Sequence, residues 1–267
     1  MSCHAALELD HHGRGASPVH GLDPLAKLLA AAGVTLAAIS FPKHATGELL
    51  PLFLFPALLM ALGQVPLRPF FRLLLIGLPF AVMAGVWNIF LDPARVRLPS
   101  GVEFSAGWLS FLSILLRYLL TAGTVLALIG TTSFPRLLQA FIRLHAPHAF
   151  VQLLNLLYRY IFVLTEEGRA LTHAWQLRCP QRRLPDPAVA AGLAGNLFLR
   201  TEARSRRIYR AMTLRGYDGT LPFRTHEGWT RRDLLFLLLV LAATAAVRLL
   251  PLTQWLGGAA LKFPGVQ

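Results

Sequence analysis

Five apolar stretches dominate this sequence, and each is long enough to form a helix across much of a lipid bilayer. They lie at residues 25–41, 47–63, 70–91, 107–130 and 233–250. About 20 consecutive apolar residues span the hydrocarbon core as a helix, which satisfies its backbone hydrogen bonds without water. Only 15% of the residues are charged, against about 25% in soluble domains. The sequence therefore predicts an all-α, polytopic membrane protein with about five transmembrane helices.

Positive charge is concentrated in the interval 131–232, between the fourth and fifth apolar stretches. This interval contains 16 arginines and six acidic residues, so it carries +10 of the net charge of +13. Positive segments of membrane proteins stay in the cytoplasm. We therefore expect a cytoplasmic N-terminus and a connection at 92–106 on the outer side. No nucleic-acid-binding motif accompanies the arginines, so the lipid bilayer and not nucleic acid is the expected partner.

The pattern predicts four consecutive regions. Residues 1–22 form a cytoplasmic N-terminal tail, residues 23–131 hold transmembrane helices 1–4, and residues 233–267 hold the last transmembrane helix and a short tail. The cytoplasmic module at 132–232 is predicted to contain helices at 135–145, 147–178 and 188–215, because apolar residues recur there at helical spacing. Asp23 and Pro24 favour a helix start, and Gly216 favours a helix end.

Polar and small residues inside the apolar stretches need separate interpretation. We expect Lys27 to extend its ammonium to the membrane interface. For Arg117, about ten residues into the fourth stretch, a functional or paired charge and an interfacial side chain on a tilted helix are equal alternatives. Ala81 and Gly85 lie four residues apart, which favours close helix packing, either within the chain or against a sliding partner.

The sequence lacks the common motifs of catalysis. None of its lysines (Lys27, Lys43 and Lys262) follows a glycine, so the chain has no G-x-x-x-x-G-K-[ST] loop for ATP. We therefore expect no enzymatic activity and no cofactor. The N-terminal tail offers weak metal-binding candidates whose spacing matches no standard zinc site, and a solvated tail is favoured. These candidates are Cys3, His4, His11 and His12.

The two long helices of the basic interval are predicted to end alike. In each, an alanine lies four residues before an arginine, a leucine directly precedes the arginine, and a small residue follows it. The arginines could compensate the helix macrodipole, which contributes about 0.3–1 kcal/mol. Two such ends also suggest paired anchors, because the arginine fork binds carboxylates in bidentate fashion. The ends comprise Ala174, Leu177 and Arg178 before Cys179, and Ala211, Leu214 and Arg215 before Gly216.

Three blocks of the sequence resemble the T component (transmembrane coupling subunit, CbiQ or NikQ type) of cobalt/nickel energy-coupling-factor (ECF) ABC transporters. They are HGLDPLAKLL at 20–29, LYRYIFVLTEE at 157–167 and RAMTLRGYDG at 210–219. The resemblance covers almost the whole chain. It implies a non-catalytic, multi-pass subunit of the bacterial inner membrane. Two soluble ABC-type ATPase subunits and a substrate-binding membrane subunit of CbiM or NikM type are its implied partners.

The resemblance also implies how the subunit couples ATP hydrolysis to import of Co²⁺ or Ni²⁺. In the family, two cytoplasmic coupling helices end in Ala-Arg-Gly-like motifs, and each arginine docks in a groove of one ATPase. The matching positions here are Arg178 and Arg215. A leucine precedes each arginine in place of alanine, and Cys179 replaces the glycine at the first end.

Two other functions remain open from the residues alone. A self-sufficient secondary metal transporter would use the histidines and cysteine of the tail and would need no ATPase. An intramembrane enzyme would use Arg117 and Asn88 and would show turnover as purified protein. Cobalt and nickel are equal alternatives as cargo.

Overall fold

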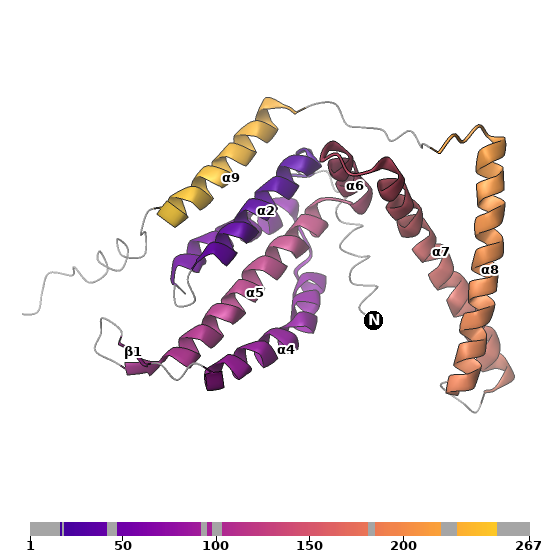
Figure 1. Ribbon diagram of the computed structural model, residues 1–267, viewed down its shortest axis with the longest axis horizontal. Coiled ribbons are helices and arrows are strands. Elements are labelled where there is room, and N and C mark those ends of the chain that lie inside the picture. The colour runs from indigo at the N-terminus through magenta and orange to yellow at the C-terminus, as the bar shows by residue number, and fades with distance from the viewer. Residues whose placement is uncertain are drawn as a thin grey trace, which may run out of the picture. The chain divides into compact units, whose positions relative to one another are not determined.

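The computed structural model describes residues 17, 19–41, 47–91, 95–97, 103–180, 185–219 and 229–249. The chain divides into two compact units, Met1–Ala140 with His226–Gln267, and Phe141–Thr225. Almost all of the described residues are helical, which confirms the predicted all-α class (Figure 1). The strands in the described part of the chain form one short antiparallel pair, β1 (Arg95–Arg97) and β2 (Glu103–Ser105).

The first unit is built around α5 (Ala106–Thr131). This helix packs against α2, α3 and α4, and α2 packs in turn against α9 (Figure 1). Leu120 of α5 lies in a buried cluster with Ala38 and Leu49. The other helices are α2 (Pro24–Ser40), η1 (Gly47–Phe53), α3 (Leu54–Gly63), α4 (Leu67–Leu91), α6 (Phe134–Arg143) and α9 (Arg231–Leu249). The last three residues of α6 belong to the second unit.

Helix α2 begins where the sequence predicts. Pro24 is its first residue, and the Asp23 side chain accepts a hydrogen bond from the Leu25 backbone N–H at 2.9 Å. The Asp23 backbone N–H donates to Asp233 Oδ1 at 2.8 Å, which joins the start of α2 to the first turn of α9. The two helices therefore begin side by side although they are 207 residues apart in sequence, from Pro24 to Arg231.

Helices α4 and α5 approach closely because glycines of α4 face large side chains of α5. A Cβ at Gly77 would lie 2.3 Å from the Tyr118 hydroxyl, and one at Gly85 would lie 2.6 Å from the Phe111 ring. Ala81 is also buried. The predicted pair of Ala81 and Gly85 therefore serves packing within the chain.

The first unit has the surface of a membrane protein. Helices α4 over Leu67–Asn88 and α5 over Ser110–Thr131 are long and apolar enough to cross a membrane, and Pro24–Ser40 and Leu49–Gly63 are shorter apolar helices. Large apolar side chains of α4, including Phe80 and Trp87, face outward, as expected for helices that contact lipid. The predicted apolar stretch at 47–63 does not form one regular α-helix. It is a 3₁₀ turn followed by α3, with Pro51, which has no N–H to donate, inside the 3₁₀ turn.

The second unit consists mainly of two long helices, α7 (His148–Arg178) and α8 (Pro187–Leu214), which cross each other (Figure 1). The sequence predicted both helices to within one residue at each end. Apolar side chains of both helices, among them Leu164 and Met212, line a groove between them, and α8 has no residue that is fully buried.

Candidate functional site

The predicted site residues of α7 lie in an exposed final turn. Ala174, Leu177 and Arg178 are all exposed, and the helix continues through Arg178. The Cys179 backbone N–H caps the end by donating to the Trp175 carbonyl at 3.0 Å. Cys179 has φ −129° and ψ 65°, so this helix ends without a left-handed residue at its C-cap.

The end of α8 has a different geometry. The Tyr217 N–H donates to the Met212 carbonyl and the Gly216 N–H donates to the Thr213 carbonyl, each at 3.0 Å. These two bonds form a Schellman motif, with Gly216 at φ +83° in the left-handed region that glycine adopts without strain. Arg215 is the C-cap residue and follows the last helical residue, Leu214. The prediction that Gly216 ends this helix is confirmed.

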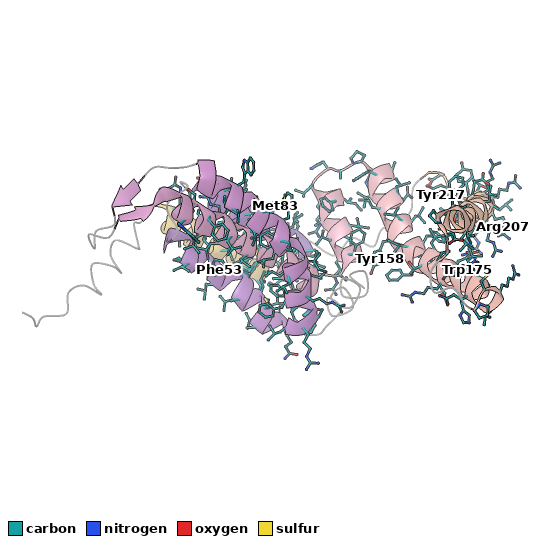
Figure 2. The ribbon with its side chains drawn as sticks, turned by 90° about the horizontal axis from the view of Figure 1, so that it is seen from below. Phe53, Met83, Tyr158, Trp175, Arg207 and Tyr217 are labelled. Atoms are coloured by element: carbon teal, nitrogen blue, oxygen red, sulfur yellow. The ribbon has the colours of Figure 1, made fainter. Side chains whose placement is uncertain are left out.

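The arginine ends present basic, solvent-facing surfaces. Leu214 is 89% exposed and Leu177 is 71% exposed, and Ala211, Arg178 and Arg215 are also exposed. Within the described part of the chain, neither Arg178 nor Arg215 forms an ion pair. Both guanidinium groups therefore remain available to a partner. Figure 2 shows the side chains of this unit, with Trp175 labelled on α7 and Arg207 on α8.

The structure does not bring the two arginine ends together. Helix α8 begins nine residues after Arg178 and runs back across α7, so the Arg215 end lies at the far end of α8 from its start (Figure 1). With 28 residues, α8 is about 42 Å long at a rise of about 1.5 Å per residue. The arrangement offers two separate attachment points and not one combined site.

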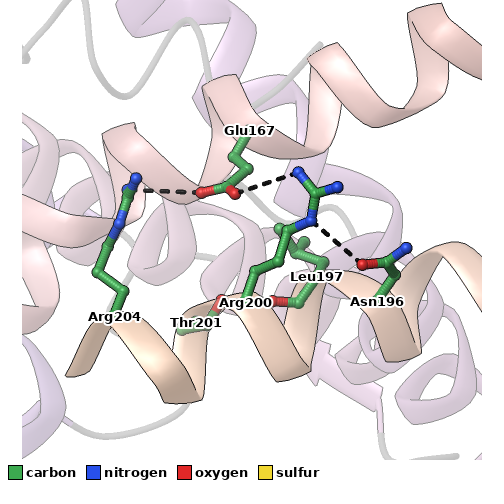
Figure 3. Close-up of polar contacts among 6 residues, drawn as sticks. All are labelled: Glu167, Asn196, Leu197, Arg200, Thr201 and Arg204. Carbon is green, nitrogen blue, oxygen red and sulfur yellow. Dashed lines mark hydrogen bonds and ion pairs between the residues drawn. The ribbon is translucent and has the colours of Figure 1, made fainter. Parts of the chain in front are cut away.

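Polar contacts join α7 and α8 near their crossing. Glu167 of α7 lies 3.7 Å from an Arg200 nitrogen and 3.4 Å from an Arg204 nitrogen, both on α8 (Figure 3). Arg200 Nε also donates to Asn196 Oδ1 at 3.1 Å. These ion pairs were not predicted from the sequence, because many of the arginines of α8 stand at helical spacings that could face either water or α7.

A second polar contact joins the end of α8 to the start of α7. The Tyr217 hydroxyl donates to Gln152 Oε1 at 3.3 Å, and Gln152 is only 4% exposed. Tyr217 directly follows Gly216, so the left-handed turn that ends α8 also directs this side chain back to α7. The sequence signal for this contact is a single glutamine on the apolar side of α7, which is too weak to identify a partner.

Two charged residues within the apolar helices of the first unit, Arg117 and Lys27, have structural partners. Arg117 Nη2 donates to the Phe41 carbonyl at 2.7 Å, just after the end of α2, a contact that the paired alternative predicts. Lys27 is 1% exposed, and the expectation that it reaches the membrane interface is wrong. Its Nζ donates to the Thr131 carbonyl at 3.0 Å and to the Thr132 hydroxyl at 3.2 Å, because it lies beside the end of α5. Asn88 is half-buried in α4.

The weak metal candidates of the tail, Cys3, His4, His11 and His12, lie outside the described residues. Among the residues that the structure does describe, no three His, Cys, Asp or Glu side chains are grouped so as to hold a metal ion.

Comparison with known proteins assigns the chain to a family. A family model named CbiQ, described as cobalt transport protein, matches residues 15–227. An uncharacterized protein of Methanocaldococcus jannaschii is 32% identical over 116 residues, 43% of each chain. A putative fused cobalt transport protein CbiMQ of Methanocorpusculum labreanum is 32% identical over 99 residues, 37% of this chain and 16% of the relative. A second uncharacterized M. jannaschii protein is 30% identical over 117 residues, 43% of this chain and 40% of the relative.

The chain thus spans less than half of the length of each of these relatives. The family match is broader, because it covers most of the first unit and all of the second, including α7, α8 and both arginine ends. This chain therefore belongs to the CbiQ family of cobalt transport proteins.

Proposed function

We propose that this protein is the non-catalytic transmembrane coupling subunit of an ECF-type ABC importer for Co²⁺ or Ni²⁺. Two soluble ABC-type ATPase subunits bind the Arg178 and Arg215 ends, one at each end. ATP binding and hydrolysis change the distance between the two ATPases, and α7 and α8 carry this change to the transmembrane helices. The subunit spans the bacterial inner membrane about five times, with its N-terminus in the cytoplasm.

The observation that carries the proposal is the pair of exposed arginine ends on crossing helices. Each arginine follows an exposed leucine at a helix terminus, and neither is held by an ion pair among the described residues. Long helices transmit displacement because their backbone hydrogen bonds resist bending over many turns. Two such ends about one helix length apart suit two copies of one soluble partner better than a single small ligand.

A second membrane subunit supports import in this proposal. One relative carries a name that joins CbiM and CbiQ in a single polypeptide, which favours a CbiM-type substrate-binding partner for this chain. The cargo ion is then selected by that partner, and this chain supplies movement. The outward apolar side chains of α4 and α9, including Phe80 and Leu239, offer surface for lipid or for the partner.

The proposal is tested by replacing both anchors and measuring association. The double variant Arg178→Glu with Arg215→Glu should lose co-purification of the ATPases in mild detergent, because each substitution puts a negative charge where a cation is needed. The variant should still insert into the membrane, since both side chains are exposed and hold no part of the fold.

The matched control is Arg207→Glu, an exposed arginine in the middle of the same basic helix face. It changes the net charge of α8 in the same way without touching either end. We expect ATPase association close to that of the unaltered protein. Undiminished ATPase association in the double variant, or equal loss in the Arg207→Glu control, would refute the anchor assignment.

A further inference from the structure

The contact between α7 and α8 is short. At the crossing, a Cβ built on Gly168 of α7 would lie 3.7 Å from Leu197 Cδ2 of α8, an ordinary van der Waals distance, so the two helices touch at this point. On one side of this point the helices diverge around a groove of about 500 Å³ lined by residues such as Leu164 and Met212. On the other side they diverge around a groove of about 220 Å³ that includes Leu171 and Leu193.

Apolar packing at one point leaves the crossing angle weakly defined. Helices that interlock over several turns settle at preferred angles, because ridges of one fit into grooves of the other. Here the side chains on both sides of the crossing face open grooves, so rotation about Gly168 and Leu197 disturbs few apolar contacts. Some other interaction must fix the angle if the two helix ends are to keep a defined spacing.

Glu167 is placed to provide that interaction. Its side chain is 20% exposed and forms ion pairs with Arg200 and Arg204, which lie on successive turns of α8 (Figure 3). Two contacts one helical turn apart fix direction along α8, whereas one contact would act only as a pivot. Asn196, one turn earlier in α8, accepts a hydrogen bond from Arg200, and this bond orients the guanidinium toward Glu167.

The Tyr217–Gln152 contact closes the far side of the larger groove. It lies next to the Arg215 end, because Tyr217 follows that arginine by two residues. The polar contacts at Glu167 and Gln152 thus bound the groove at both ends. A change of the crossing angle must strain or break at least one of them.

We propose that Glu167 is a positioning residue that sets the angle at which α7 and α8 cross, and so fixes the spacing between the Arg178 and Arg215 ends. The consequence of this role of Glu167 for transport rests on the proposed function. The effect of Glu167 on the crossing angle does not depend on it. Release of the Arg200 and Arg204 pairs frees the two ends to move relative to each other.

Distance measurement on the full chain in lipid nanodiscs tests this directly. One spin label is placed on Cys179, which is exposed and lies at the end of α7, and the second on Arg210→Cys in α8, with Cys3→Ser removing the other thiol. The unaltered Glu167 protein should give one narrow distance distribution. Glu167→Gln should broaden and shift it, because the neutral amide loses both ion pairs.

Three controls make the result specific. Glu166→Gln, an exposed neighbour with the same chemistry, should leave the distribution unchanged. The charge-swapped variant Glu167→Arg with Arg200→Glu and Arg204→Glu should restore a narrow distribution. Labels at Ala188→Cys and Arg210→Cys, both on α8 and introduced together with Cys3→Ser and Cys179→Ser, should keep their distance in every variant.

Each outcome decides the assignment. Identical distributions for Glu167→Gln and the parent overturn it, as does equal broadening in Glu166→Gln. Broadening between the two α8 labels also overturns it, because the helix itself is then lost.

In the assembled transporter, Glu167→Gln should keep ATPase co-purification and lower metal uptake per ATP hydrolysed. Failure of any ATPase to bind the parent chain refutes the proposed function and leaves the distance result standing.

Discussion

Lys27 of α2 donates a hydrogen bond from Nζ to the backbone carbonyl of Thr131, the last residue of α5, at 3.0 Å. The last carbonyls of a helix have no partner within it, so Lys27 satisfies one of them and places a cation at the negative end of the helix dipole. The same ammonium reaches the Thr132 hydroxyl. One buried side chain thus joins the start of α2 to the end of α5.

Replacing Lys27 should weaken the first unit. Lys27→Met keeps most of the side-chain volume but leaves the Thr131 carbonyl and the Thr132 hydroxyl without their donor. Leaving buried polar groups unsatisfied costs roughly 1–3 kcal/mol. We expect the variant to unfold at a lower temperature than the parent protein, as measured in detergent by the change in intrinsic fluorescence on heating.

The control for this prediction is Arg72→Met, which removes a basic side chain from an exposed position of α4. It should change the unfolding temperature little. Equal unfolding temperatures for the Lys27 and Arg72 variants would show that the Lys27 contacts contribute nothing measurable.

Two glycine substitutions should act in opposite directions. Gly85→Ala adds a methyl group that would lie 2.6 Å from the Phe111 ring. This ring cannot easily move away, because it packs edge-on against Trp108. Overpacking of this kind costs about 1–3 kcal/mol. Gly192→Ala in α8 meets nothing within 4 Å and removes a flexible residue from a helix interior, a gain of about 0.5–1 kcal/mol.

The two glycine variants are best compared in one thermal-shift series with the parent protein. The expected order of unfolding temperature is Gly192→Ala, then parent, then Gly85→Ala. A stabilising Gly85→Ala would contradict the close approach of α4 and α5.

Arg117 and Arg248 both act on the end of α2, but they should differ in effect. Arg117 donates to the Phe41 carbonyl at 2.7 Å from a half-buried position, whereas the exposed Arg248 lies over the Phe41 ring, 5.2 Å from its centroid. Arg117→Leu therefore removes a charged hydrogen bond, worth about 1.5–3 kcal/mol. Arg248→Leu removes an exposed cation–π contact of about 0.5–1 kcal/mol and a long, exposed hydrogen bond to the Ser40 carbonyl at 3.5 Å. Unfolding in detergent should show the larger loss for Arg117→Leu, and a larger loss for Arg248→Leu would reverse this assignment.

The sequence predicted regular elements well where one physical rule dominates. Asp23 with Pro24 marked the start of α2, and Gly216 marked the end of α8, because capping depends on local chemistry. Hydropathy alone did not predict that the stretch at 47–63 begins as a 3₁₀ segment, because Pro51 acts on the backbone independently of hydropathy. The Arg95–Arg97 and Glu103–Ser105 pair was also missed, since three-residue strands give almost no periodic signal.

Pairings between distant residues could not be predicted from the sequence. Lys27 lies 104 residues from Thr131 along the chain, and nothing local to either residue indicates the other. Glu167 and its adjacent Glu166 look alike in the sequence, yet only Glu167 meets the arginines of α8. The arginine ends at Arg178 and Arg215 were recognisable because they repeat a pattern. Their separation by the length of α8 could be seen only in the folded structure.

The orientation of the chain remains a prediction that the native Cys179 can test. This thiol is exposed next to the α7 end, and Cys3→Ser leaves it as the only cysteine of the sequence. A membrane-impermeant maleimide should label it in inside-out vesicles and not in right-side-out ones. A second protein with Arg97→Cys, in the connection between α4 and α5, and with Cys3→Ser and Cys179→Ser should show the reverse pattern. Labelling of both proteins from the same side would contradict the predicted topology.

The central claim is that this chain couples ATP hydrolysis to metal entry and does not transport metal by itself. Uptake of Co²⁺ and of Ni²⁺ should be measured in proteoliposomes that contain this chain and its substrate-binding subunit, with and without the ATPases. We predict ATP-dependent uptake of at least one ion, which is lost with Arg178→Glu and Arg215→Glu and unchanged by deletion of residues 2–15. Uptake by this chain alone, without ATPases or ATP, would contradict the account.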